Sequence, residues 1–230
     1  MRQADNCSRV NSCLNSFLVA PPLLYGMRAM RWGPSYEPLD PPVLLQAVLC
    51  ISIGYFTQDL YVTFKYKTPR WPIFVLHHLF ALLPYVSYYF RPACHTGIFI
   101  LCSFMLVEST NVLYNMQQWL EDVGRVEGPA YLFSVYGTLA GWIVFRLVNP
   151  VFSLYVSERY VVPSARPGAE RQCLYPSLVS AYFVNAFCLL AFFTVILKDI
   201  LLRRGWVRSE KRAAPALPAK TNPELLCTLG

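Results

Sequence analysis

Residues 71–90 read WPIFVLHHLFALLPYVSYYF, an apolar stretch that contains two adjacent histidines, His77 and His78. About 20 consecutive apolar residues are enough for a helix to cross the hydrocarbon core of a bilayer. Ionisable side chains inside such a crossing are costly, so they suggest a function by default. The preceding apolar stretch carries Asp59 and the following one carries Glu108. We therefore expect the function of this protein to depend on the place where these four side chains meet.

The composition of the whole chain favours a membrane protein. The 230 residues are 55% hydrophobic and only 14% charged, whereas about 25% of the residues of a soluble domain are charged. The net charge of +7 does not indicate a nucleic-acid-binding protein, because seven of the 20 basic residues follow Leu197, directly behind the last apolar stretch. Such a cluster is typical of the cytosolic end of a membrane protein, and no nucleic-acid partner is expected.

Five stretches of the chain are long and apolar enough to span a membrane. Each must be helical, because every backbone amide inside a bilayer has to be bonded within its own segment. The sequence therefore predicts an all-α fold, a multi-pass transmembrane bundle of about five helices. The predicted spans are Val43–Phe64, Trp71–Phe90, Gly97–Met116, Tyr131–Val156 and Leu178–Leu197. The longest connector is expected at Ser157–Ser177, which contains three prolines.

Polar segments flank the five spans and divide the chain into three parts. Residues 1–42 are expected to be a polar or irregular N-terminal segment, since their apolar run Phe17–Gly26 contains a Pro-Pro pair and is too short to span. Residues 43–202 are the predicted transmembrane domain. Residues 203–230, basic at first and then rich in Ala and Pro, are expected to be a disordered cytosolic tail.

The distribution of Lys and Arg near the span ends predicts the orientation of the bundle. Ten basic residues fall on the side of the first and third connectors and the C-terminal tail, and six fall on the opposite side. This excess predicts a cytosolic C-terminus and a luminal or extracellular N-terminal segment. The sequon Asn6-Cys7-Ser8 would then lie where glycosylation occurs. Cys94 and Cys173 would share an oxidising compartment, although their pairing cannot be deduced from the sequence.

The ionisable residues of neighbouring spans come to similar depths. At about 1.5 Å per residue, Asp59 lies about 8 Å, His77 about 9 Å and Glu108 about 12 Å inward from the cytosolic ends of their spans. These depths predict a shared pocket that opens to the cytosol. One histidine could act as a nucleophile or general base, assisted by a carboxylate that fixes its tautomer and raises its basicity. Equally, the histidines could be a structural pair that bonds neighbouring helices without chemistry.

The polar residues inside the spans suggest a lipid ligand rather than a metal. Two histidines and two carboxylates could hold iron or zinc. Adjacent histidines on a helix point about 100° apart and chelate less well than an i, i+4 pair, so no metal is expected. Asn111 and Asn115 of the third span could line a cavity, or they could bond neighbouring helices. Together with Arg146 of the fourth span, they are the candidate lipid-binding residues.

The fourth span carries a charge and a close-packing motif. Arg146 is expected about 22 Å along its helix from Tyr131, near the luminal edge, where it would snorkel or bind a lipid phosphate. Gly137 and Gly141 form a GxxxG pattern, which allows helices to approach closely. We expect this pattern to serve packing inside the bundle rather than dimerisation.

Four sequence elements, taken in order, resemble the TLC-domain family, which includes ceramide synthases and the translocating-chain-associated membrane protein. They are Gly54-Tyr55-Phe56 with Asp59, then His77-His78-Leu79, then Glu108-Ser109-Thr110 with Asn111 and Asn115, then Phe145-Arg146-Leu147. The resemblance covers about residues 43–202. It implies a helical domain around a lipid-accommodating cavity, in an endoplasmic-reticulum, Golgi or plasma membrane. Family members usually have one or two helices before the Gly-Tyr-Phe helix, so this chain is expected to lack the family's first helices, as a shortened form would.

The resemblance implies a choice between two lipid-related functions. In the ceramide synthase branch, paired histidines support N-acylation of a sphingoid base from acyl-CoA, which would make His77 or His78 the acyl acceptor here. The synthases follow their pair with His-Asp and a further Asp, whereas this chain has Glu108-Ser109-Thr110. The latter version resembles the non-synthase branch, whose members are linked to membrane lipid composition and fluidity.

Three functional hypotheses follow. The first is a regulator of membrane lipid composition that binds a lipid, with His77, His78, Glu108 and Asp59 as candidate catalytic residues only if chemistry takes place. The second is an acyl-CoA-dependent N-acyltransferase, for which acyl-CoA is a substrate and no cofactor is expected. The third is a cargo or translocation-assisting factor with structural histidines. The expected partners are membrane lipids, with either a membrane protein or a second copy of the chain closing the bundle.

Overall fold

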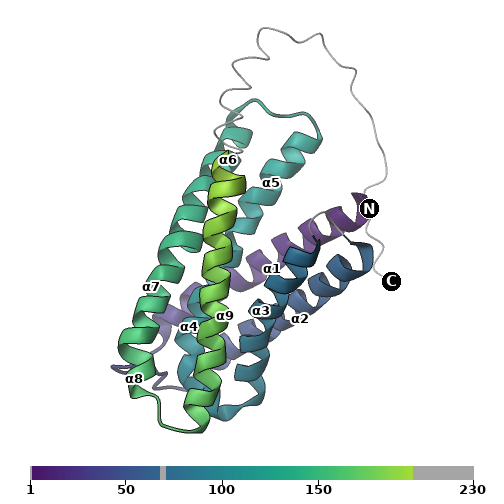
Figure 1. The fold of residues 1–230 in the computed structure, drawn as a ribbon. Coiled ribbons are helices and arrows are strands. Elements are labelled where there is room, and N and C mark those ends of the chain that lie inside the picture. The colour runs from purple at the N-terminus through teal and green to yellow at the C-terminus, as the bar shows by residue number, and fades with distance from the viewer. Residues whose placement is uncertain (1, 68–70, 199–230) are drawn as a thin grey trace.

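Long apolar runs make this protein almost entirely helical (Figure 1). The computed structural model describes residues 2–67 and 71–198. The α-helices are α1 (Arg2–Ala29), α2 (Val43–Tyr66), α3 (Trp71–Phe90), α4 (Ile98–Met105), α5 (Asn111–Asp122), α6 (Pro129–Gly141), α7 (Asn149–Val156), α8 (Val162–Ser164) and α9 (Ala169–Ala191). The 3-10 segments are η1 (Pro92–Gly97) and η2 (Leu106–Thr110), and the π-helical segments are η3 (Trp142–Val148), η4 (Ser157–Val161) and η5 (Phe192–Ile196).

Several of these segments join end to end into longer helices. Within the described ranges, five helices are long and apolar enough to cross a membrane, namely Val43–Tyr66, Trp71–Phe90, Cys94–Asp122, Pro129–Ser164 and Ala169–Ile196. Many of their large apolar side chains remain exposed on the outside of the bundle, as expected where a bilayer replaces water. The predicted all-α, multi-pass membrane architecture is confirmed. The predicted tail, residues 203–230, and the basic cluster beyond Lys198 lie outside the described residues.

The last two spans are longer than the sequence predicts. The fourth runs from Pro129 to Ser164, and the fifth begins at Ala169. The prediction of a long connector at Ser157–Ser177 is therefore wrong, because only a short turn separates the two helices. The prolines of this region do not all mark a connector, because Pro176 lies inside α9. Helices within a membrane bundle tolerate proline because neighbouring groups satisfy the freed backbone carbonyl.

Residues 2–29 form a further long helix, α1, where the sequence analysis expects an irregular segment. That expectation is wrong. The helix continues through Pro21 and Pro22, although a proline in a helix interior costs about 3 kcal/mol. Burial offsets this cost, since Val19 and Leu23 on either side of the prolines are 1% and 0% exposed. Both belong to an apolar cluster shared with α2, so tertiary packing overrides the local preference.

α1 runs antiparallel to α2. Near the end of α1, Gly26 lies so close to the start of α2 that a Cβ there would be 2.7 Å from Leu45 Cδ2. Near the start of α1, Ser8 reaches Asp59 in the second half of α2. The start of α1 and the end of α2 therefore lie at the same end of the bundle (Figure 1). The expectation that the N-terminal segment lies across the membrane from the end of α2 is wrong for the start of α1.

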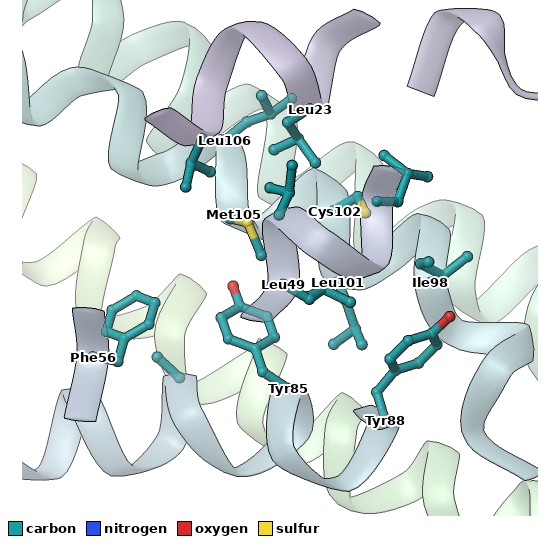
Figure 2. Packing of buried hydrophobic residues seen from close by; sticks show 14 of the residues in the cluster. Leu23, Leu49, Phe56, Tyr85, Tyr88, Ile98, Leu101, Cys102, Met105 and Leu106 are labelled. Carbon is teal, nitrogen blue, oxygen red and sulfur yellow. The ribbon is translucent and has the colours of Figure 1, made fainter. Parts of the chain in front are cut away.

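The main apolar core lies where α1, α2, α3 and α4 meet. Figure 2 shows Leu23 of α1, Leu49 of α2 and Tyr85 of α3 gathered around Leu101 and Met105 of α4. Because α1 supplies part of this core, it is an integral wall of the bundle rather than an appended segment.

The GxxxG pattern brings α6 against the third span. A Cβ at Gly137 would lie 2.7 Å from Leu113 Cδ1, and one at Gly141 would lie 3.2 Å from Thr110 Cγ2. Only a residue without a side chain fits at this distance without displacing its neighbour. The pattern therefore serves packing inside the bundle, as predicted.

A disulfide joins Cys94 of η1 to Cys173 of α9. The pairing that the sequence left open is thus formed, at the end of the bundle opposite the start of α1. Trp32, which follows α1, packs edge-on against Phe99 near this disulfide, with ring centroids 5.3 Å apart. The chain therefore runs from the contact of Ser8 with Asp59 to the disulfide end of the bundle at Trp32.

Candidate functional site

The helix α3 presents its two histidines to different neighbours. Adjacent residues of a helix point about 100° apart, and the ring centroids of His77 and His78 are 5.4 Å apart. Both side chains are buried. His78 faces Asp59 of α2, whereas His77 faces Phe187 of α9. The pair therefore does not act on one point, and each histidine has its own surroundings.

His78 lies at the end of a row of three side chains in contact. Its Nε2 lies 3.1 Å from Oδ2 of Asp59. The other carboxylate oxygen of Asp59 accepts a 2.5 Å hydrogen bond from the hydroxyl of Ser8 in α1. A carboxylate in this position fixes which ring nitrogen of the imidazole carries the proton. The row Ser8–Asp59–His78 thus orients His78 from two other helices.

His77 lies instead at a cavity between α3, α4 and α9. Its ring stacks on that of Phe187 at 4.7 Å between centroids. The cavity walls are mostly apolar, and the polar residues among them include His77, Glu108, Ser177 and Ser180. Nδ1 of His77 is buried and has no hydrogen-bond partner among the described residues. The predicted meeting of a histidine with Glu108 is observed here, but Asp59 does not line this cavity.

A second cavity continues the first toward the disulfide. It is lined by Cys94 and Cys173 and shares Ile100, Leu101 and Ser177 with the cavity at His77. The two cavities follow one another along the same three helices. On α3 they extend from His77 to Tyr88, eleven residues and about 16 Å apart. This direction leads away from the end of α2, whereas the sequence analysis expects the pocket to open toward that end.

Glu108 belongs to a buried charged network. Its carboxylate accepts a 2.7 Å hydrogen bond from Asn111 and lies 3.9 Å from Nη2 of Arg146. Arg146 donates to Thr110 Oγ1 at 2.8 Å and to Asn111 Oδ1 at 2.7 Å. Its guanidinium also lies over the ring of Trp142, 4.6 Å from the centroid. Each buried charge therefore has both an opposite charge and hydrogen bonds, which is the condition for keeping it in a low-dielectric interior.

The prediction that Arg146 snorkels to the luminal edge is wrong. The side chain is only 7% exposed. The helix that carries it extends from Pro129 to Ser164, beyond the predicted span Tyr131–Val156, so that Arg146 lies near its middle. It belongs to the π-helical segment Trp142–Val148, an irregularity that is frequent at functional sites.

Asn115 faces α1 rather than the cavity. Its Nδ2 lies 3.3 Å from the backbone oxygen of Arg9 and 3.5 Å from Sγ of Cys13. Neither Asn115 nor the other two candidate lipid-binding residues, Asn111 and Arg146, lines the cavity at His77. Their contact with lipid stays a prediction. Across residues 2–67 and 71–198, no three His, Cys, Asp or Glu side chains come together as a metal site.

Three serines of α1 that were not among the predicted site residues complete the site. Ser8 bonds the carboxylate beside His78, Ser12 is hydrogen-bonded to Tyr55, and Ser16 donates to the backbone oxygen of Glu108 at 2.7 Å. The three serines recur at intervals of four residues, which places them on one face of a helix. That spacing was the available signal. The spacing is easily overlooked because the sequence predicts a polar or irregular segment over residues 1–42 rather than a helix.

These features define the class of the protein: a multi-pass helical membrane protein with a histidine pair, two carboxylates and an arginine inside its bundle. A family model for the TLC domain matches residues 6–202. The chain belongs to the TLC domain family, which is associated with lipid metabolism and homeostasis. A search of curated proteins and a search of solved structures each found no match.

The family match also bears on the N-terminal segment. It begins at residue 6 and therefore includes α1, whereas the sequence analysis places the start of the domain at residue 43. A helix does precede the one that carries Gly54-Tyr55-Phe56, contrary to the expectation that residues 1–42 supply none. The branch of the family to which the chain belongs stays a prediction.

Proposed function

We propose that this protein regulates membrane lipid composition by binding the hydrocarbon chain of a lipid in the cavity between α3, α4 and α9. One observation carries the proposal: two small, mostly apolar cavities follow one another inside a membrane bundle, and the larger is lined by polar groups of His77 and Glu108. Sites with apolar walls and a few placed polar groups suit ligands with a long apolar body and one polar end. The association of the family with lipid homeostasis supports a lipid as that ligand.

The test is the lipid composition of cells that express the protein. Expression of the unaltered chain should shift the acyl composition of phospholipids or the sphingolipid profile, and His77→Ala should abolish the shift. His95→Ala is the matched control, because His95 lies in η1 and does not line the cavity at His77. Equal effects of the unaltered chain and His77→Ala would overturn the proposal. An unchanged lipid profile with altered export of a client protein would favour a cargo factor instead.

A second candidate is an acyl-CoA-dependent N-acyltransferase. The observation that favours it is the row Ser8–Asp59–His78, which orients one imidazole directly beside His77 at the cavity. Transfer of an acyl group from CoA to an amine forms an amide and releases the CoA thiol. Membranes that contain the protein would be given labelled acyl-CoA and a sphingoid base. Equal amounts of amide and free thiol, both lost in His77→Ala and His78→Ala, would establish this enzyme. Their absence would leave the binding function alone.

The same proposal includes an orientation. Disulfides persist in oxidising compartments, and the Cys94–Cys173 bridge lies at the end of the bundle opposite Lys65 and Lys67. The excess of basic residues on the latter side supports a cytosolic location for it. We therefore assign the ends of α2 and α9 to the cytosol and the disulfide to the lumen of the endoplasmic reticulum or Golgi, or to the cell exterior.

A further inference from the structure

We infer that the lipid bound in this cavity has an uncharged polar end that carries hydroxyl, ester or amide groups, rather than a phosphate or a carboxylate. The inference rests on the proposed function, because it names the chemistry of the ligand of the same cavity. Two observations carry it. One is the distribution of charge around the cavity, and the other is a pair of polar side chains that lack partners.

The charges around the cavity disfavour an anion. Among the described residues that line the cavity at His77, none is Lys or Arg. The basic side chain that approaches the wall, Arg146, lies behind Glu108 and already donates to Thr110 and Asn111. A phosphate or carboxylate would therefore meet the carboxylate of Glu108 with no cation to compensate its loss of water. An unpaired charge is very costly in such surroundings.

The unpartnered side chains favour neutral hydrogen-bonding groups. Nδ1 of His77 and Oγ of Ser180 have no hydrogen-bond partner within the part of the chain that the structure describes. Both residues line the cavity, and both can bond a hydroxyl, an ester or an amide. Ser177 differs, because its hydroxyl already bonds the backbone oxygen of Cys173 at 3.0 Å. His77 and Ser180 are therefore the cavity residues whose hydrogen-bonding atoms a ligand could satisfy.

The positions of these two residues describe the shape of the polar end. Phe187 stacks on His77, and Ser180 lies seven residues before it in α9, about 10 Å along the helix axis. Neutral oxygen atoms spread over such a distance fit a head group with several hydroxyl, ester or amide groups. They do not fit one compact charged group. The hydrocarbon chain would extend past Ser177 into the second cavity, toward the disulfide.

The experiment compares three photoreactive lipids that have the same diazirine-bearing chain: a monoacylglycerol, a fatty acid and a lysophosphatidic acid. The purified full-length protein in nanodiscs is irradiated with each, and labelled peptides are located by mass spectrometry. We expect the monoacylglycerol to label α3, α4 and α9 at least about tenfold more than either anion, a ratio that corresponds to about 1.4 kcal/mol. Equal or stronger labelling of these helices by an anionic probe would overturn the inference.

A variant tests the role of Ser180. Ser180→Ala should weaken labelling by the monoacylglycerol about fivefold to tenfold, the effect of one buried hydrogen bond. Ser157→Ala is the matched control, since Ser157 is equally buried but its hydroxyl bonds Ser153 in its own helix. Equal labelling of the two variants would overturn the assignment of Ser180. If none of the three probes labels these helices, the proposed function itself fails, and the comparison among probes no longer applies.

Discussion

On the side of α3 that faces α1 and α2, Ser8 donates a hydrogen bond to Asp59, whose other carboxylate oxygen lies 3.1 Å from Nε2 of His78. On the side that faces α9, the ring of His77 stacks on Phe187 and lines a cavity. Nδ1 lacks a hydrogen-bond partner among the described residues in both histidines, so the contrast lies in the carboxylate beside His78 and the cavity beside His77. Two neighbouring residues of the same type thus have opposite surroundings. The comparison teaches that a polar pair in a membrane span need not have one role. We propose that the side with Ser8, Asp59 and His78, here called the bonded side, stabilises the bundle, and that the cavity side binds a ligand.

The largest expected effect concerns the bonded side. Asp59→Ala would leave His78 and the hydroxyl of Ser8 without their partner in the bundle interior. Removing one member of a buried ion pair typically costs about 3–5 kcal/mol, so the thermal unfolding of the protein in detergent should shift to much lower temperature. Asp40→Ala is the control, because Asp40 pairs with Arg31 at an exposed position. Similar unfolding temperatures for both variants would show that the row does not stabilise the bundle.

The next effect concerns α1 as the wall of the bonded side. Leu23→Ala removes a side chain that is 0% exposed, whereas its neighbour Leu24 is 49% exposed. Truncation of a buried leucine costs about 2–5 kcal/mol, so Leu23→Ala should destabilise the protein and Leu24→Ala should not. Both are measured by the same unfolding experiment. A larger effect at Leu24 would mean that the face of α1 packed on the bundle is not the one that carries Ser8 and Ser16.

A third prediction separates the two histidines. His77→Phe keeps a ring against Phe187, so it should change stability by less than about 1.5 kcal/mol, as volume-conserving core substitutions do. Its effect on lipid composition should be lost. His78→Phe should lower the unfolding temperature markedly, because it removes the imidazole beside the buried carboxylate of Asp59. Unfolding temperatures measured beside lipid profiles check both variants. If both substitutions destabilise equally, the contrast between the two sides of α3 does not hold.

A smaller effect is expected at the hydrogen bond between α1 and the Glu108 segment. Ser16→Ala removes the donor to the backbone oxygen of Glu108, and such a loss costs about 1 kcal/mol. Thr194→Ala removes a hydroxyl that bonds only the backbone of its own exposed helix face and should be neutral. Unfolding temperatures determined on both variants in the same detergent compare the two. A neutral Ser16→Ala would indicate that packing alone seats this part of α1.

The sequence predicts the spans well because apolar runs of bilayer length leave little choice of structure. The sequence does not predict α1, because serines such as Ser8 can be hydrated or can bond a buried carboxylate. Only the position of Asp59 in the folded bundle shows that Ser8 does the latter. The prediction for Arg146 is wrong because its helix, Pro129–Ser164, extends past the apolar run Tyr131–Val156. The meeting of His77 with Glu108 was expected from their depths. The cavity between them depends on the rotation of each helix about its axis, and the spacing of residues along one helix does not determine that rotation relative to its neighbours.

At the sequon Asn6-Cys7-Ser8 we expect no glycosylation. Ser8 bonds Asp59 on the bonded side of the bundle, at the end that we assign to the cytosol, so treatment with a glycosidase should not change the mobility of the protein. A sequon introduced between Ala165 and Gly168, where α8 and α9 connect near the disulfide end, should be glycosylated. Because both sites are read in one chain, the pattern reports orientation independently of expression. Glycosylation at Asn6 alone would reverse the orientation of the bundle and would place the bonded row nearer the oxidising side.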